Sequence, residues 1–242
     1  RLNFGTGINS DADYASLVKE KLQEVTDRPF ETACDLVEAT QDTSTFVHVS
    51  GVLKSIATKV SKICNDLRLL SSGPRTGFNE INLPKMQPGS SIMPGKVNPV
   101  IPEVVNQVAF QVIGNDVTIS MASEGGQLQL NVFEPVIAFN LFQSIFMMCN
   151  AFETLAYKCV VGITANEERC QEMVLNSIGL VTALNPYIGY QNATSVAKEA
   201  LESNKSVYDI VLERELLSEE QLREYLKPEN MTHPNRRNKC DT

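Results

Sequence analysis

The sequence contains no tryptophan, only two histidines and no clustered cysteines. With His48 and His233 as the only imidazoles, a histidine-based metal site is not expected. The six cysteines are widely spaced and form no CxxC pair, which argues against a zinc site. Several of them stand among apolar residues, so we expect reduced, buried thiols in a cytoplasmic protein.

Concentrated positive charge is also missing. The 242 residues carry a net charge of −8 at pH 7, and the one compact basic cluster, residues 236–239, has the composition of a solvated tail. Nucleic-acid surfaces usually concentrate Lys and Arg, so no nucleic-acid partner is expected. An acidic protein can still bind a dianion where a few donors converge.

The sequence shows no secretion signal and no uninterrupted membrane-spanning run. Its most apolar segment, 132–161, is broken by Asn140, Gln143, Asn150 and Glu153. We therefore expect no membrane partner, and we expect this segment to be a helix at the centre of a helical assembly.

Helical spacing of apolar residues dominates the chain and predicts an all-α fold. Asp11 is expected to cap the first helix, and Ser206 and Ser218 to cap two later ones. The clearest pattern, over 42–70, predicts one buried stripe made of Val49, Leu53, Ile56, Val60, Ile63, Leu67 and Leu70. The expected helices cover 11–24, 31–40, 42–70, 99 through Val117 to the polar break at 123–127, 132–161, 166–175, 192–203, 206–214 and 218–226.

Three of these helices have about 25 to 30 residues and are therefore roughly 40 Å long. A chain of this length cannot cover all their faces, so we expect an oligomeric helical bundle, most simply a symmetric homo-oligomer. After Gly162 the helices become shorter, which predicts a separate small C-terminal helical domain.

Residues 73–98 have no helical period and are rich in Pro and Gly, which is typical of a functional or a disordered segment. They include Gly89-Ser-Ser-Ile-Met-Pro-Gly-Lys-Val-Asn-Pro99, which offers two hydroxyls, an ammonium and a carboxamide directly before a helix start. Helix starts present unpaired N–H groups. The residues alone therefore indicate either a site for a carboxylate or phosphate, or a solvated loop.

The same eleven residues match every fixed position of the active-site signature Gly-Ser-Ser-x-Met-Pro-x-Lys-x-Asn-Pro of the fumarase/aspartase superfamily. The resemblance implies an all-helical homotetramer whose active sites each take residues from three subunits. Residues 1–164, with the active-site loop 73–98, would form part of the central helical-bundle domain, and 165–242 the C-terminal domain. Further segments that resemble the aspartase branch are 64–75, 80–84, 100–116, 126–135 and 182–190.

The resemblance also implies roles. Ser90 matches the general base, Lys96 and Asn98 match residues that bind a substrate carboxylate and help to activate that serine, Ser91 matches a substrate-binding serine, and Glu103 matches the acidic partner of a catalytic histidine. The implied activity is a carbon–nitrogen lyase that removes ammonia from L-aspartate through an aci-carboxylate to give fumarate. This route requires neither a metal nor an organic cofactor.

Three of these roles have a simpler alternative. Ser91 can hold the shape of the loop, Asn98 can cap the helix near Pro99, and Glu103 can favour the helix start through the dipole. His48 is read as an ordinary helical residue, and His233 is given no chemical role. For the whole protein the alternatives are a class II fumarase, which eliminates water, and a non-catalytic helical oligomerisation module.

The family's remaining substrate-binding segments have no counterpart here. These are a Thr/Ser-rich loop and the histidine that would pair with Glu103. The chain also starts at Arg1 rather than Met. We therefore expect a fragment of a longer enzyme that is inactive alone.

Overall fold

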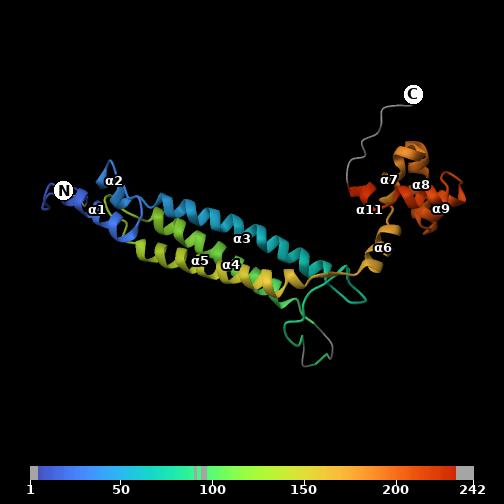
Figure 1. Ribbon diagram of the computed structural model, residues 1–242, viewed down its shortest axis with the longest axis horizontal. Coiled ribbons are helices and arrows are strands. Elements are labelled where there is room, and N and C mark those ends of the chain that lie inside the picture. The colour runs from blue at the N-terminus through green and yellow to red at the C-terminus, as the bar shows by residue number, and fades with distance from the viewer. Residues whose placement is uncertain (1–4, 90–91, 94–96, 233–242) are drawn as a thin grey trace. The chain divides into compact units, whose positions relative to one another are not determined.

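The structure is a computed structural model that describes residues 5–89, 92–93 and 97–232. Within these residues the regular structure is almost all helix, with only two short strands, which confirms the predicted all-α class (Figure 1). Two compact units are present, Arg1–Thr164 and Ala165–Thr242. The first contains α1 (Tyr14–Thr26), α2 (Leu36–Gln41), α3 (Ser44–Leu70), strand β1 (Ile81–Asn82), α4 (Val100–Glu124), α5 (Glu134–Lys158) and the short 3-10 helix η1 (Val160–Gly162).

The three longest helices, α3, α4 and α5, lie side by side in the first unit (Figure 1). Helix α4 contacts both neighbours extensively, and α3 runs antiparallel to it, since Ser50 pairs with Asp116 while Ser61 pairs with Asn106. Three apolar clusters follow one another along these helices. Their buried members are Cys64, Val105, Ala151, Leu155 and Cys159; Ala57, Ala109, Val112 and Met148; and Ile119, Ala122, Ile137 and Leu141.

The predicted buried stripe of α3 is only partly correct: Leu53, Val60 and Leu67 are partly buried and pack against the apolar clusters. The residues of α3 that the unit buries are Ser50, Ala57, Ser61 and Cys64. Val49, Ile56 and Ile63, which were expected inside, are 39–46% exposed. Small residues allow α3 and α4 to approach closely, so the branched side chains lie at the edges of this contact or outside it. The period was right, but the direction of the buried face depended on the neighbour.

Polar groups run through the contacts between these helices. The Asp116 carboxylate is 4% exposed and accepts from the Ser50 hydroxyl at 2.8 Å and from the Lys54 ammonium at 2.5 Å. Asn106 donates to the carbonyl and hydroxyl oxygens of Ser61 at 3.0 and 2.8 Å. Buried polar groups must be paired, so these bonds fix how far the helices can slide along each other.

Helix α5 differs from its prediction in two respects. Among the described residues, Glu134–Gly162 is the one helical stretch long and apolar enough to cross a membrane, so the expectation that its polar residues exclude this was wrong. Core helices of water-soluble proteins meet the same criterion. Moreover, α5 is buried on one face only within this chain, because Phe139, Phe142 and Phe146 are 63–70% exposed.

The first two helices begin later than predicted. Helix α1 starts at Tyr14, and Asp11 does not cap it; Asp13 occupies the cap position without a side-chain bond. None of the residues of α1 is buried. Helix α2 starts at Leu36 because the Asp35 carboxylate accepts from the N–H groups of Val37 and Glu38.

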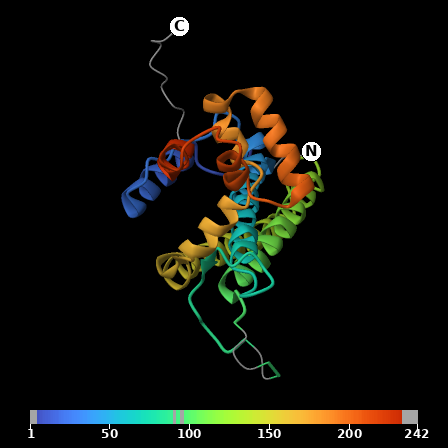
Figure 2. The same ribbon diagram turned by 90° about the vertical axis from the view of Figure 1, so that its right-hand side faces the viewer.

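The second unit is built from short helices, coloured orange to red in Figure 2. The caps predicted at Ser206 and Ser218 are confirmed, and Ser218 forms a complete capping box with Gln221. Helices α7 and α11 were not predicted. Helix α7 contains Pro186, which reads locally as a helix breaker, yet its Leu184 and Ile188 are core residues. Strand β2 (Thr164–Ala165), which pairs with β1, begins at the last residue of the first unit. The helices of the second unit are α6 (Glu167–Leu175), α7 (Leu180–Ile188), α8 (Tyr190–Ser203), α9 (Val207–Glu213), α10 (Glu219–Tyr225) and α11 (Pro228–Thr232).

Candidate active site

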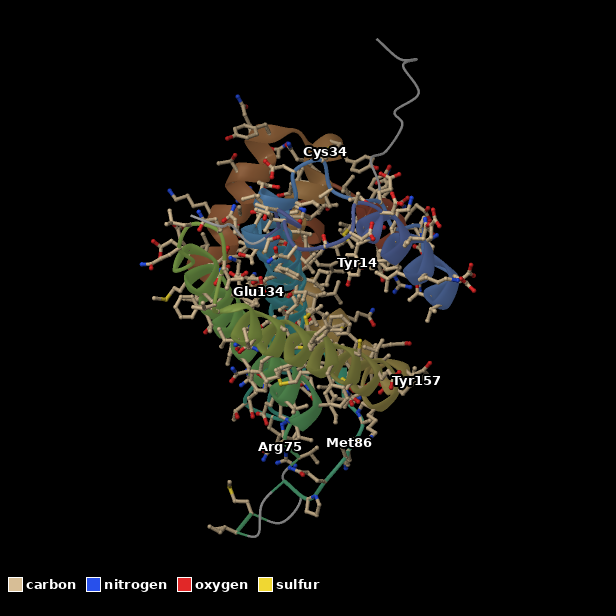
Figure 3. The ribbon with its side chains drawn as sticks, turned by 90° about the vertical axis from the view of Figure 1, so that its left-hand side faces the viewer. Tyr14, Cys34, Arg75, Met86, Glu134 and Tyr157 are labelled. Carbon is tan, nitrogen blue, oxygen red and sulfur yellow. The ribbon has the colours of Figure 1, made fainter. Side chains whose placement is uncertain are left out.

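The candidate site lies on the connection between α3 and α4, which begins with a compact turn at residues 71–80. The N–H of Asn79 donates to the Ser72 carbonyl at 2.9 Å, and the N–H of Glu80 donates to Leu70 at the same distance. Gly77 is required here, because a Cβ at this position would lie 2.4 Å from the Ser72 carbonyl. Arg75, labelled in Figure 3, is exposed between the two ends of this turn.

The next part of the connection is held against the end of the α5 region. Strand β1 pairs with β2, and the Asn82 amide donates to the Thr164 hydroxyl at 3.2 Å. Pro84 lies so close to Gly162 that a Cβ on the glycine would be 2.5 Å from the proline ring. Residues 85–88, including Met86 in Figure 3, are exposed. The connection is therefore anchored up to Pro84 before it enters the signature segment.

Of the five predicted site residues, three lie outside the described residues: Ser90, Ser91 and Lys96. Asn98 is described and is half-buried. Its Nδ2 donates to the Gly89 carbonyl oxygen at 2.8 Å. This bond joins Gly89, which precedes Ser90, to Asn98, which follows Val97. The sequence pattern did not indicate that these two residues are bonded.

Helix α4 starts without a side-chain cap. The cap position is Pro99, so the alternative reading of Asn98 as the N-cap is wrong. The N–H of Val100 donates to Asn98, the N–H of Glu103 donates to Pro99, and Pro102 has no N–H. This first turn consequently offers fewer free donors to an anion than a helix start usually does.

Glu103 is half-buried in the first turn of α4, where a carboxylate interacts favourably with the helix dipole. No histidine of the described chain is near it. His48 is exposed on α3 and lies two residues before Ser50, which pairs with Asp116 of α4. Asp116 is about 20 Å along α4 from Glu103 at 1.5 Å per residue, so His48 lies near the opposite end of α4 from Glu103. His233 lies outside the described residues.

The cysteines do not provide a nucleophile at the centre of the bundle. Cys64 and Cys159 are buried in one cluster. Burial, together with the neighbouring Cys159 thiol, raises the pKa of Cys64 to about 11, and burial also raises the pKa of Cys159. Both thiols therefore stay protonated at neutral pH. Cys34 and Cys149 are exposed, contrary to the expectation of buried thiols. In the part of the chain that the structure describes, no group of His, Cys, Asp or Glu could hold a metal.

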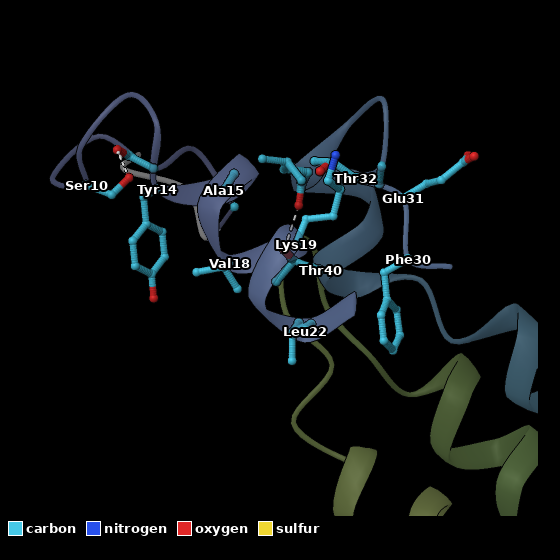
Figure 4. A pocket seen from close by; sticks show the side chains of 14 residues that line it. Ser10, Tyr14, Ala15, Val18, Lys19, Leu22, Phe30, Glu31, Thr32 and Thr40 are labelled. Carbon is cyan, nitrogen blue, oxygen red and sulfur yellow. Dashed lines mark hydrogen bonds between the residues drawn. The ribbon is translucent and has the colours of Figure 1, made fainter. Parts of the chain in front are cut away.

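One hollow of about 570 Å³ lies outside the signature segment, around α1 and α2 (Figure 4). Tyr14, Val18, Leu22, Phe30 and Thr40 contribute to its lining. The hollow is mainly apolar and brings together none of the predicted site residues.

Comparisons with known proteins match the whole chain except its ends. A family model described as "Lyase" matches residues 3–114, and one described as "Fumarase C C-terminus" matches residues 180–233. Similar curated proteins include the aspartate ammonia-lyases of Helicobacter pylori, Pseudomonas aeruginosa and Escherichia coli, at 67%, 62% and 57% identity over 96% of this chain. The chain spans about half the length of these relatives, 48–49%.

Solved structures give the same pattern. A structure described as "fumarate lyase:delta crystallin from Brucella melitensis bound to cobalt" matches with a TM-score of 0.90 and 51% identity, over 96% of this chain and 50% of that one. A recombinant class II fumarase from Schistosoma mansoni matches with a TM-score of 0.85 and 36% identity, over 94% of this chain and 51% of the fumarase.

Proposed function

Because this chain belongs to the fumarase/aspartase superfamily of lyases, we propose that in a protein of its relatives' full length it takes part in the reversible elimination of ammonia from L-aspartate to give fumarate. The chain spans about half of those relatives, so its share of the site is the signature segment and the start of α4.

One observation carries the choice of substrate. Identity to aspartate ammonia-lyases is 57–67% over 96% of the chain, whereas the class II fumarase structure is 36% identical over 94%. Both reactions remove a proton next to a carboxylate and then expel a small leaving group. The greater likeness to the aspartases favours ammonia over water as that group.

The proposed chemistry assigns each site residue one task. Ser90, as an alkoxide, takes the proton from the carbon beside one carboxylate, and the electron pair moves into that carboxylate to give the aci-carboxylate. Lys96 and Asn98 donate to its oxygens, where the negative charge has increased. Ser91 donates to substrate. The pair then returns to form the double bond, the carbon–nitrogen bond breaks, and ammonia leaves.

Glu103 is proposed to act through a histidine from the part of the fold that this chain does not contain. Its place in the first turn of α4, only five residues after Asn98, is compatible with that task. The reaction as proposed uses only groups of the polypeptide.

The exposed apolar faces support a homotetramer in the full-length protein. Large apolar side chains on α4 and α5 are 63–70% exposed in this chain: Phe110, Met121, Phe142 and Phe146. Monomeric soluble proteins rarely expose large contiguous apolar patches. Covering them with copies of the same helices would bury them in a shared bundle. We propose residues 1–164 for this bundle, residues 165–242 for the C-terminal domain, and the cytoplasm for the protein.

The test is to express the full-length protein and to follow the ultraviolet absorbance of fumarate, with L-aspartate as substrate and malate as the comparison. Ser90→Ala is expected to lower kcat by about 10²- to 10⁴-fold without loss of the oligomer, because a general base contributes that much. Ser203→Ala, which removes an exposed hydroxyl from α8, should leave kcat unchanged. Turnover of malate alone would replace the proposal by a fumarase, and a fully active Ser90→Ala enzyme would show that the base is a different residue.

A further inference from the structure

We propose that Asn98 is a positioning residue that ties together the two ends of the signature segment, in addition to its proposed contact with substrate. The catalytic consequence rests on the proposed function, whereas the structural role does not. The observation is the hydrogen bond from Asn98 Nδ2 to the Gly89 carbonyl oxygen at 2.8 Å. By sequence, Ser90, Ser91 and Lys96 all stand between these two residues.

The two partners of this bond are attached to the rest of the unit very differently. The Asn98 backbone is continuous with α4, and its carbonyl accepts from the Val100 N–H at 2.9 Å. Gly89 instead follows the exposed residues 85–88. The bond therefore transmits the rigidity of α4 to the end of the segment that directly precedes Ser90. Connecting both ends of a short segment removes many conformations that it could otherwise adopt.

A carboxamide can do this and still bind substrate. It has two N–H groups and one acceptor oxygen, so one N–H can hold Gly89 while the other donates to a carboxylate. An aspartate at position 98 has almost the same shape but, when ionised, only accepts. Its oxygen would face the Gly89 carbonyl oxygen, so the bond would be replaced by repulsion. Asn98→Asp is consequently the sharpest test of the proposed tie.

The first experiment uses the chain without any substrate. Limited digestion with trypsin is followed by mass spectrometry, and the rate of cleavage after Lys96 is divided by the rate after Lys85, which lies outside the tied segment. Asn98→Asp is expected to raise this ratio up to about tenfold, the change that loss of one hydrogen bond produces. The matched control is Asn192→Asp, which removes the same type of bond, to Ile188 at 2.9 Å, and should leave the ratio unchanged.

An unchanged ratio in Asn98→Asp would overturn the proposal, because a residue that only contacts substrate has no effect in its absence. The second experiment measures steady-state kinetics of the full-length enzyme. Asn98→Asp is expected to lower kcat at saturating aspartate, because both the tie to Gly89 and the proposed contact with the aci-carboxylate would be lost, so the digestion ratio is the measurement that separates the two roles. Asn98→Gln keeps the carboxamide and should recover part of kcat. Absence of lyase activity in the unmodified enzyme would refute the proposed function but would leave the digestion result standing.

Discussion

Replacing Asp116 with alanine tests whether the polar contact between α3 and α4 stabilises the first unit. The carboxylate is almost fully buried and accepts from two residues of α3, the Ser50 hydroxyl at 2.8 Å and the Lys54 ammonium at 2.5 Å. Ser50 is itself 3% exposed and has no route to water. Lys54 differs, because 46% of its side chain is exposed.

These exposures set the expected magnitude. Leaving a buried hydroxyl without its acceptor costs about 1–3 kcal/mol. The ammonium of Lys54 can turn to water, so its part of the loss is held to about 1 kcal/mol or less. Asp116→Ala should therefore lower the free energy of unfolding by about 2–4 kcal/mol. Asp116→Asn keeps an acceptor for Ser50 and should cost only about 1 kcal/mol.

The assay is urea unfolding followed by circular dichroism at one fixed protein concentration, since association would otherwise shift the apparent stability. Asp66→Ala is the control. Its carboxylate pairs with Lys62 on the same helix, both side chains are exposed, and its loss should cost no more than about 0.5 kcal/mol. The reasoning would be refuted if Asp116→Ala unfolded at the same urea concentration as the unmodified chain, or if both alanine variants lost equal stability.

Two further predictions concern backbone space and pH. Gly77→Ala should lower the free energy of unfolding of the first unit by about 1–3 kcal/mol in the same assay, because its Cβ would lie 2.4 Å from the Ser72 carbonyl. Gly114→Ala is the control: nothing lies within 4 Å of its Cβ, so it should raise the free energy of unfolding by up to about 1 kcal/mol. A Gly77→Ala chain more stable than the Gly114→Ala chain would contradict the geometry. The pKa of Cys64 is raised from 9.0 to about 11, so between these pH values the folded chain keeps a proton that the unfolded chain loses. The free energy of unfolding should therefore fall as pH rises from 9.0 to about 11, by up to about 1.4 kcal/mol per pH unit. Cys64→Ala should remove that part of the fall, and identical pH profiles for the two proteins would count against it.

Local patterns were sufficient wherever the controlling interaction is local. The long helices were predicted close to their observed bounds, since apolar residues recur at helical spacing and Pro99 and the Gly73-Pro74 pair punctuate the chain. The caps at Ser206 and Ser218 depend on residues three positions away and were also correct. Helix α7 was missed because Pro186 costs a helix one hydrogen bond locally, and burial of Leu184 and Ile188 in the core outweighs that loss.

For the candidate site, the residues themselves came from the signature, and the geometry of Ser90, Ser91 and Lys96 stays a prediction because they lie outside the described residues. For Asn98 the signature identified a residue that matters but not its partner. The carbonyl of Gly89 has no side chain and leaves no mark in a pattern of residue types, so its bond to Asn98 could be found only in three dimensions.

The sequence by itself determined that this chain forms long amphipathic helices and carries the superfamily's signature, because helix formation and motif identity depend on residues a few positions apart. Tertiary structure alone decided that Ser50, Ala57, Ser61 and Cys64 face the neighbouring helix while Val49, Ile56 and Ile63 lie largely outside. The physical reason is that a helix buries the face that allows the closest approach and satisfies its polar groups, and both conditions depend on α4, a helix that begins thirty positions further along the chain.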